Sequence, residues 1–459
     1  MASKTVSVRE VFDGNKFTPY QYLVCTLCFL VVFLDGFDLT IIGVALPKIA
    51  DFLHSKPSAL GLALGAGQFG PLVGAFILGS IADKCGRKWM LFISAIIFGV
   101  FTVLTIFITS VGQLALFRFL AGFGLGGAIP NALTFGSEYA PTRARQSLVA
   151  TMYAGMPTGA MVGGLTAAAL MPHFGWQSLF VLGGGVPILI ALAVAVFLPE
   201  SLEFLARNVK YKDEVRRIIG KVSPVLARDK DVVFVASEKK VSGVPVKRLF
   251  TEGRALTTVL LWVMCSGALY MLWILNTWSP TLLKKSGASV QQYSMAYAFL
   301  CFGAAVSSVI IGKLMDKVNP FRVLQIGFLL GFLSLVAFGF AAGGPFTIIA
   351  ILSVVCGFFI NGSQTGTLAV TTVSYPSDIR ATGIGWAYAI AKIGAMGAPA
   401  IGGYLLSLNW TVSRICSVQA LVGIFVALVI MLLEWQVFAV ARRARKAAAP
   451  SNAAPMEAS

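Results

Sequence analysis

Long apolar runs, separated by short polar or charged stretches, make up most of the chain. Each run is about as long as the roughly 20 apolar residues that a transmembrane helix needs. The pattern predicts an all-α integral membrane protein with twelve transmembrane helices in two sets of six. The first set lies near residues 22–48, 59–82, 89–109, 113–136, 148–170 and 178–198, and the second near 254–279, 293–315, 322–341, 346–372, 381–405 and 413–438.

A polar stretch between the two sets divides the chain into domains. We expect an N-terminal six-helix half over residues 1–198, a cytoplasmic linker over 199–253 and a C-terminal six-helix half over 254–438. Residues 439–459 start with a basic cluster and continue with Ala, Pro and Ser. We expect a cytoplasmic tail whose basic part faces anionic lipid headgroups and whose end is disordered.

Charged residues are scarce and unevenly placed. Hydrophobic residues make up 57% of the chain and charged residues 12%, whereas a soluble domain carries about 25% charged residues. The net charge of +17 would suit a nucleic-acid partner, but 29 of the 36 Lys and Arg residues fall on cytoplasmic segments if both termini are inside. The positive-inside rule of membrane proteins accounts for that bias. We therefore expect a multi-pass protein with both termini in the cytoplasm, the lipid bilayer as partner, and no nucleic acid.

Two loop motifs occur twice, at nearly equal separations. Residues 79–84 (GSIADK) follow the second run and 312–317 (GKLMDK) follow the eighth, 233 positions later. Residues 138–143 (EYAPTR) follow the fourth run and 374–380 (SYPSDIR) follow the tenth, 236 positions later. The repetition indicates duplicated six-helix halves. Parallel repeats joined by a long linker are typical of transporters in which the halves rock about a site near the membrane midplane.

Two acidic residues, Asp35 and Asp38, interrupt the first apolar run. A carboxylate near the bilayer centre costs at least about 2.5 kcal/mol, so intramembrane carboxylates are usually functional. The spacing of three places both on one helical face, where two carboxylates cannot both ionise cheaply. We expect one or both to carry a coupling proton, with Asp38 the stronger candidate; the alternative is a structural ion pair.

Several motifs resemble those of the major facilitator superfamily. Residues 79–88 (GSIADKCGRK) match its loop motif, and four others resemble the aromatic acid:proton symporter family within it: 35–38 (DGFD), 118–131 (RFLAGFGLGGAIPN), 138–141 (EYAP) and 380–387 (RATGIGWA). The resemblance covers essentially the whole chain. It implies a twelve-helix transporter in the bacterial inner membrane that imports a hydroxybenzoate-like acid with protons, acts as a monomer and needs no cofactor.

Two cations lie inside predicted spans. Arg118 is about five residues into the fourth run, and a buried guanidinium must be paired. Pairing with Asp38 would satisfy both groups, and protonation of Asp38 would then release Arg118 to bind a substrate carboxylate; the alternative is a purely structural pair. Lys392, where the family usually has Arg, is either a second carboxylate anchor or a snorkelling residue.

A benzoate-like anion also needs an apolar slot and groups that recognise a hydroxyl. We expect the first, fourth, seventh and tenth helices to line the cavity. The candidates are polar or aromatic residues that interrupt apolar sequence, each of which would serve equally well in helix packing: Tyr270, Trp273, Asn276, Trp278, Asn361, Gln364, Trp386 and Tyr388.

The inside loops carry charges suited to gating. We expect ion pairs that close the inner face and break during rocking, with topology determination by the basic residues as the alternative. The gating candidates are Asp83, Arg87, Arg143, Arg145, Asp316 and Arg380, together with Glu138, which is also a proton-coupling candidate.

The functions that remain open are all those of membrane proteins. No Walker loop, catalytic triad or metal-ligand cluster is apparent, so an ATP-driven pump and an enzyme are not expected. The preferred reading is proton-coupled uptake of an aromatic carboxylate. Uptake of a muconate or sugar acid, export of aromatic acids, and a non-transporting sensor remain as alternatives.

Overall fold

A computed structural model describes residues 4–15, 17–207, 209–224, 226, 232–236, 246–251, 253–376 and 379–448. Within these residues, twelve helical segments are long and apolar enough to cross a membrane. The predicted all-α membrane fold is therefore confirmed. Most predicted spans are extended by a few residues at their ends.

The first six spans form the N-terminal half of the bundle. The second and fifth are each built from two consecutive helices, and a short 3-10 turn follows the third. The elements are α2 (Pro19–Phe52), α3 (Pro57–Gly67) with α4 (Phe69–Cys85), α5 (Arg87–Leu104) with η1 (Thr105–Phe107), α6 (Val111–Glu138), α7 (Arg145–Tyr153) with α8 (Gly155–Phe174), and α9 (Gln177–Phe197).

The last six spans form the C-terminal half. The tenth contains a π-helical turn between two α-helices. The elements are α13 (Ala255–Lys285), α14 (Val290–Lys317), α15 (Pro320–Ala341), α16 (Phe346–Cys356) with η4 (Gly357–Asn361) and α17 (Gly362–Ser374), α18 (Arg380–Ser407) and α19 (Val412–Ala448).

Helix interruptions inside the membrane were not predicted. The second span breaks at Gln68 and the fifth at Ala154, although the apolar runs there looked continuous. Gly65, Gly67 and Gly70 surround the first break, and glycine is a poor helix former. A break at membrane depth is tolerated where the backbone is buried in protein or lines a cavity. Gln68 is half-buried, whereas Ala154 is exposed.

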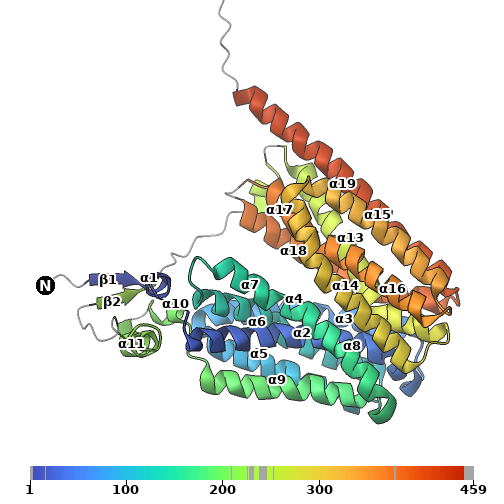
Figure 1. The fold of residues 1–459 in the computed structure, drawn as a ribbon, viewed down its shortest axis with the longest axis horizontal. Helices are drawn as coiled ribbons and strands as arrows, with labels where there is room; N and C mark the ends of the chain where they lie inside the picture. Colours follow the sequence, from blue (N-terminus) through green and yellow to red (C-terminus); the bar gives the residue numbers. More distant parts are fainter. Residues whose placement is uncertain are drawn as a thin grey trace, which may run out of the picture.

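The two halves meet at one end and separate at the other. Figure 1 shows α2–α9 (blue to green) and α13–α19 (yellow to red) as two groups that diverge toward β1, β2, α10 and α11. We call this end the cap end and the opposite one the far end. At the far end Lys284 Nζ bonds the Asp51 carboxylate at 2.5 Å and the Pro47 carbonyl at 3.0 Å, which joins α13 to α2. Glycines bring the halves together nearby: Gly61 lies against the Pro399 carbonyl and Gly164 against Ala298.

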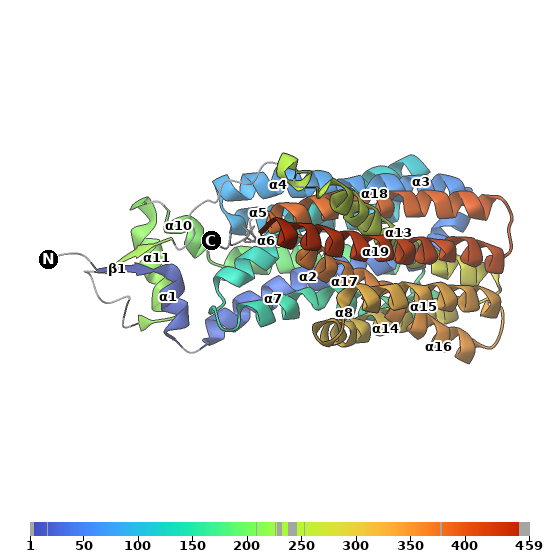
Figure 2. The same ribbon diagram turned by 90° about the horizontal axis from the view of Figure 1, so that it is seen from above.

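The N-terminal segment and the linker fold together into a small cap, which was not predicted. Strand β1 (Lys4–Ser7) pairs in parallel with β2 (Val232–Val235), and Figure 2 shows them beside α1 (Val8–Asp13) and α11 (Lys212–Gly220). The linker also contains α10 (Leu202–Leu205), η2 (Val209–Tyr211) and η3 (Val246–Leu249). Val215, Ile218 and Ile219 are buried on one face of α11, the spacing of an amphipathic helix.

The cap is attached to the N-terminal half. Asp13 accepts hydrogen bonds from the Thr142 backbone N–H (2.6 Å) and hydroxyl (2.7 Å), and these bonds hold the pKa of Asp13 below its ordinary value. Arg143 donates to the Asn15 carbonyl at 3.3 Å, and Gln21 Nε2 donates to the Tyr139 carbonyl at 2.7 Å. The end of α6 and its following loop therefore carry the cap.

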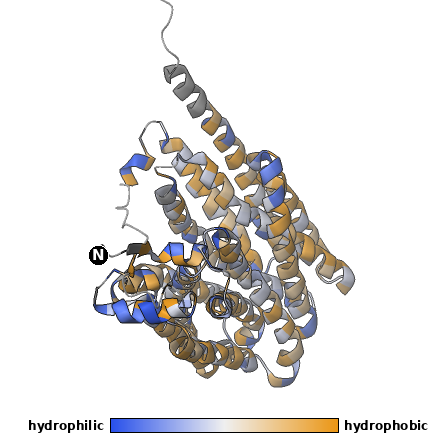
Figure 3. Cartoon of the chain, turned by 60° about the vertical axis from the view of Figure 1, so that its left-hand side comes forward, coloured by the Kyte–Doolittle hydropathy of each residue, from blue (hydrophilic) through white to orange (hydrophobic). Residues whose placement is uncertain are grey.

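The C-terminal helix extends beyond the membrane. Its span ends at Phe438, as predicted, and α19 continues through the basic segment to Ala448, because Ala, Arg and Lys are strong helix formers. The expected disorder concerns residues 449–459, which lie outside the described part. Figure 3 shows hydrophobic residues along the spans and hydrophilic ones concentrated in the cap and at helix ends.

Candidate functional site

A cavity of about 350 Å³ lies between the two halves. Its walls come from the first, second, fourth and fifth spans of the N-terminal half and from α13 and α18 of the other half. The volume is in the range of small-molecule sites, which are mostly apolar with a few convergent polar groups. None of its lining residues comes from the described part of the tenth span, contrary to our expectation. Gly303 and Gly357 bring that span against α14 instead.

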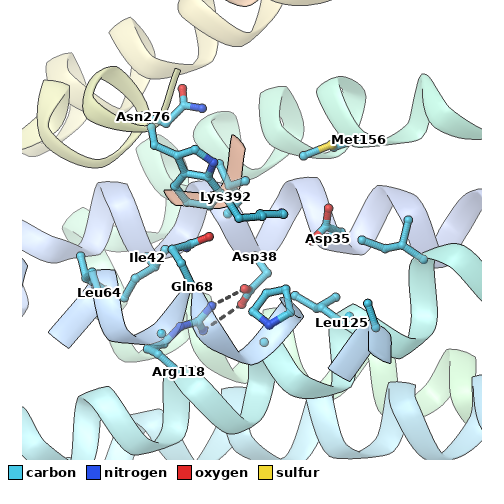
Figure 4. Close-up of a pocket in the computed structure, with 18 of the residues that line it drawn as sticks. Asp35, Asp38, Ile42, Leu64, Gln68, Arg118, Leu125, Met156, Asn276 and Lys392 are labelled. Carbon is cyan, nitrogen blue, oxygen red and sulfur yellow. Dashed lines mark hydrogen bonds and ion pairs between the residues drawn. The ribbon is translucent and has the colours of Figure 1, made fainter. Parts of the chain in front are cut away.

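A buried ion pair closes one side of the cavity. Asp38 and Arg118 are 2% and 8% exposed. Arg118 Nη1 donates to Asp38 Oδ1 at 3.0 Å and Nη2 bonds Oδ2, so the pair is bidentate (Figure 4). Gly67, at the end of α3, contacts Arg118 Cβ and makes room for it. The expected contact between these two residues is present, and a bidentate pair of this kind is strong and geometrically fixed.

Two other charged groups face the same cavity without such a partner. Asp35 of α2 and Lys392 of α18 both line it and are half-buried. Among the residues that the structure describes, neither makes a hydrogen bond or an ion pair. They belong to different halves and interact electrostatically across the cavity, and Arg118 also acts on Asp35. An anion bound here would meet an ammonium group that has no competing contact.

Aromatic and amide side chains form part of the remaining wall. Trp273 and Asn276 of α13 and Tyr388 of α18 line the cavity, as expected. Gln68 and Tyr153 also line it and were not predicted. Gln68 carried a usable signal, because it is a single amide within an apolar, glycine-rich run. Tyr153 carried none, since the break that exposes it was not recognised.

Several candidates lie elsewhere. The cavity wall does not include five of the candidates: Tyr270, Trp278, Trp386, Asn361 and Gln364. Three of these bond or stack elsewhere. The Tyr270 hydroxyl bonds the Gln419 side chain, and Trp278 Nε1 donates to the Pro399 carbonyl at 3.1 Å. Trp386 stacks on Trp262. Helical rotation explains the difference on α13, where Tyr270 faces a different side from Asn276.

The gating candidates of the N-terminal half bond within that half. Arg87 forms an ion pair with Glu138, which also accepts from the Ser201 hydroxyl. Glu200 accepts from the backbone N–H groups of Arg87 (2.8 Å) and Lys88 (3.0 Å). This cluster ties the start of α5 to the end of α6 and to the linker. Glu138 lies at the cap end, away from the cavity.

The contacts that the structure describes for the other loop charges also stay within one half. Arg145 donates to the Ser137 hydroxyl at 3.3 Å, and Arg380 Nε donates to the Tyr375 carbonyl at 3.3 Å. Asp316 is exposed and has no ion pair with another described residue. The Asp83 side chain lies outside the described part. Among the described residues, an ion pair joins the halves at the far end, between Asp51 and Lys284, which were not predicted.

Comparison with known proteins gives a consistent result. The family model of the Major Facilitator Superfamily matches residues 28–345 and 270–456. The chain is 36% identical to the 4-hydroxybenzoate transporter PcaK of Acinetobacter baylyi, over 90% of this chain and 91% of that one. It is 34% identical to the benzoate transport protein of the same species, over 89% and 88%.

Solved structures show the same fold. A bacterial homologue of the human lysosomal transporter Spinster superposes with a TM-score of 0.70 at 18% identity, covering 93% of this chain and 98% of that one. The family match, the sequence relatives and the twelve spans together show that the protein is a membrane transporter and not an enzyme. The chain belongs to the Major Facilitator Superfamily and is related to transporters of aromatic acids.

Proposed function

We propose that this protein imports an aromatic carboxylate together with protons across the bacterial inner membrane by alternating access. The observation that carries the proposal is the cavity between the halves, which holds two carboxylates, two cations and aromatic side chains. The names of the relatives, which transport 4-hydroxybenzoate and benzoate, support an aromatic acid as cargo.

Lys392 is the proposed anchor for the substrate carboxylate. It lines the cavity and forms no ion pair with another described residue, so binding an anion breaks no existing contact. An ammonium group in a water-poor cavity gains from an anionic partner. Trp273 and Tyr388 provide aromatic surface for the ring of the substrate.

Charge balance supplies the link to protons. Asp35 and Asp38 offset Arg118 and Lys392, so the four ionised groups sum to zero. A monoanion adds one negative charge to a site where net charge is costly, and one proton on a carboxylate removes it. Protonation of Asp38 would also release Arg118 from its bidentate pair, so that the guanidinium becomes available to the substrate.

The direction of access follows from charge placement. The cap end carries the excess of Lys and Arg, and the positive-inside rule then makes it cytoplasmic, with both termini inside. In this arrangement the far end is closed and the protein faces inward. We propose that residues 1–198 and 254–438 rock as two units in a monomer, with 199–253 between them. Opening at the far end would require separation of Asp51 from Lys284.

Uptake into proteoliposomes tests the proposal. Labelled 4-hydroxybenzoate, a muconate and a sugar acid are offered under an inward proton gradient, with and without an uncoupler. We expect gradient-dependent accumulation of the aromatic acid alone, abolished by the uncoupler and by Asp38→Asn. If only a non-aromatic acid accumulates, the proposed substrate class is wrong. If the Asp38→Asn variant accumulates as much aromatic acid as the wild type, Asp38 does not carry the coupling proton.

A further inference from the structure

We propose that Gln68 and Asn276 form a hydrogen-bonding subsite at the far-end side of the cavity, which recognises a hydroxyl group on the substrate ring. The inference rests on the proposed function and extends it to the ring substituent. The preferred cargo is then an aromatic acid whose hydroxyl group lies away from its carboxylate.

Both amides are free to bind a ligand. Asn276 is 7% exposed, and its Oδ1 atom is buried without a hydrogen-bond partner among the described residues. The side-chain amides of Asn276 and Gln68 make no hydrogen bond with any other residue that the structure describes, although both residues line the cavity. A buried polar group without a partner costs roughly 1–3 kcal/mol. A ligand that completes these bonds removes that cost.

Asn276 is displaced from the Asp38–Arg118 pair along the helix axes, whereas Gln68 lies beside that pair. The backbone carbonyl of Asn276 lies against Gly43 of α2, and Gly43 follows Asp38 by five residues, which corresponds to about 7.5 Å at the α-helical rise. Gln68 directly follows Gly67, which packs against Arg118. Figure 4 shows Asp35 on the other side of the pair from Asn276. We call the side with Asp35 the charged pole of the cavity and the side with the two amides its amide pole.

Apolar side chains also line the cavity. Ile42, Leu64 and Trp273 belong to its wall, with Ile42 and Leu64 on the same side as Gln68 (Figure 4), and they suit the faces of an aromatic ring. A substrate with its carboxylate at Lys392 would place its opposite edge toward the amides. An amide both donates and accepts, so the two side chains suit a hydroxyl, which does the same. A hydroxyl adjacent to the carboxylate would remain at the charged pole and out of reach.

The subsite predicts that the affinity for 4-hydroxybenzoate exceeds the affinity for similar acids that lack a hydroxyl at this position. A neutral hydrogen bond contributes roughly 0.5–1.5 kcal/mol, or about two- to tenfold in affinity. Two amides therefore predict a preference of roughly tenfold or more for 4-hydroxybenzoate over benzoate, 2-hydroxybenzoate and 4-chlorobenzoate. The chloro compound is the sharpest comparison, because it fills similar space and offers no hydrogen to donate.

The test measures initial uptake rates of these four acids in proteoliposomes for the wild type, Asn276→Leu and Gln68→Leu. We expect each variant to lower the ratio of 4-hydroxybenzoate to 4-chlorobenzoate uptake by about two- to tenfold. The ratio within one variant does not depend on how much protein is correctly folded. Gln419→Leu is the matched control: it removes a buried amide of the same half that lies outside the cavity, and we expect its ratio to equal that of the wild type.

The outcomes separate the two proposals. Transport of all four acids with the same ratio in both amide variants as in the wild type would overturn the subsite alone. Equal uptake of 4-hydroxybenzoate and 4-chlorobenzoate by the wild type would overturn it as well. If the wild type transports no aromatic acid at all, the proposed function fails and the subsite fails with it.

Discussion

The two halves of the bundle treat their polar groups differently. In the N-terminal half, Arg118 is paired with Asp38 and Arg87 with Glu138, and both bonds stay within the half. In the C-terminal half, Lys392 faces the cavity without an ion pair among the described residues, and Asp316, the repeat counterpart of Asp83, is exposed. The ion pairs of the N-terminal half therefore have no counterpart at these positions of the C-terminal half, although Asp35 of the N-terminal half also lacks an ion pair among the described residues.

This difference suggests a division of labour. Satisfied, buried pairs fix their elements relative to one another, whereas groups without partners remain available to a ligand. The N-terminal half, with the cap docked on it, is suited to act as the rigid part, and in the proposed function its Asp38 takes up the proton. The C-terminal half supplies the proposed carboxylate anchor Lys392, whereas the two amides of the proposed subsite come one from each half. Three sets of substitutions examine the contrast.

The largest effect is expected for the buried pair. Removing one partner of such a pair strands the other charge and typically costs about 3–5 kcal/mol. We expect Arg118→Met to lower the thermal unfolding temperature in detergent strongly and to abolish uptake. The double variant Arg118→Met/Asp38→Asn carries no stranded charge and should regain most of the stability, but not the coupled uptake. A single variant as stable as the wild type would show that the pair does not stabilise this half.

A smaller effect, on binding and not on stability, is expected at Lys392. A hydrogen bond to a charged group contributes roughly 1.5–3 kcal/mol, so Lys392→Met should raise the KM for the aromatic acid about ten- to hundredfold. Because Lys392 has no ion pair to lose within the described structure, unfolding should change little. Lys392→Arg should keep the affinity within a fewfold, since its guanidinium suits a carboxylate. A clear loss of stability in Lys392→Met, with an unchanged KM, would place Lys392 with the structural charges.

The smallest effect is expected at the loops. Glu138 is buried against Arg87 and Ser201, whereas Asp316 is exposed. We expect Glu138→Gln to destabilise the protein by about 1–3 kcal/mol and Asp316→Asn to stay within about 0.5 kcal/mol of the wild type. The thermal unfolding temperatures of the two variants, measured against that of the wild type, test this expectation. Equal losses would mean that both loops stabilise the fold to the same degree.

Much of the fold was predictable because the bilayer imposes simple requirements on a sequence. The twelve spans follow from apolar length alone. The breaks at Gln68 and Ala154 were not predicted, because a short interruption leaves the average hydropathy almost unchanged. The cap was missed for a different reason: β1 and β2 are four residues each and meet only through a contact between distant parts of the chain.

The charged residues of the site were predictable, because placing a charged side chain inside a membrane costs free energy. Asp35, Asp38, Arg118 and Lys392 stand out in apolar runs, and the structure gathers all four at one cavity. Uncharged candidates were less well placed, because an amide or an aromatic ring serves equally in helix packing. Whether such a residue faces the cavity depends on helix rotation and on tertiary contacts, as the contrast between Asn276 and Tyr270 shows.

The glycine contacts at the far end have a consequence for energy conservation. A protein that exploits a proton gradient must not dissipate it while its cavity is open to one side. At Gly61 and Gly164 the opposing helices touch almost backbone to backbone, and contact this close leaves little room for the chain of water molecules along which protons would leak. If a proton gradient drives the protein as proposed, these glycine contacts would limit the leak of protons through its closed end.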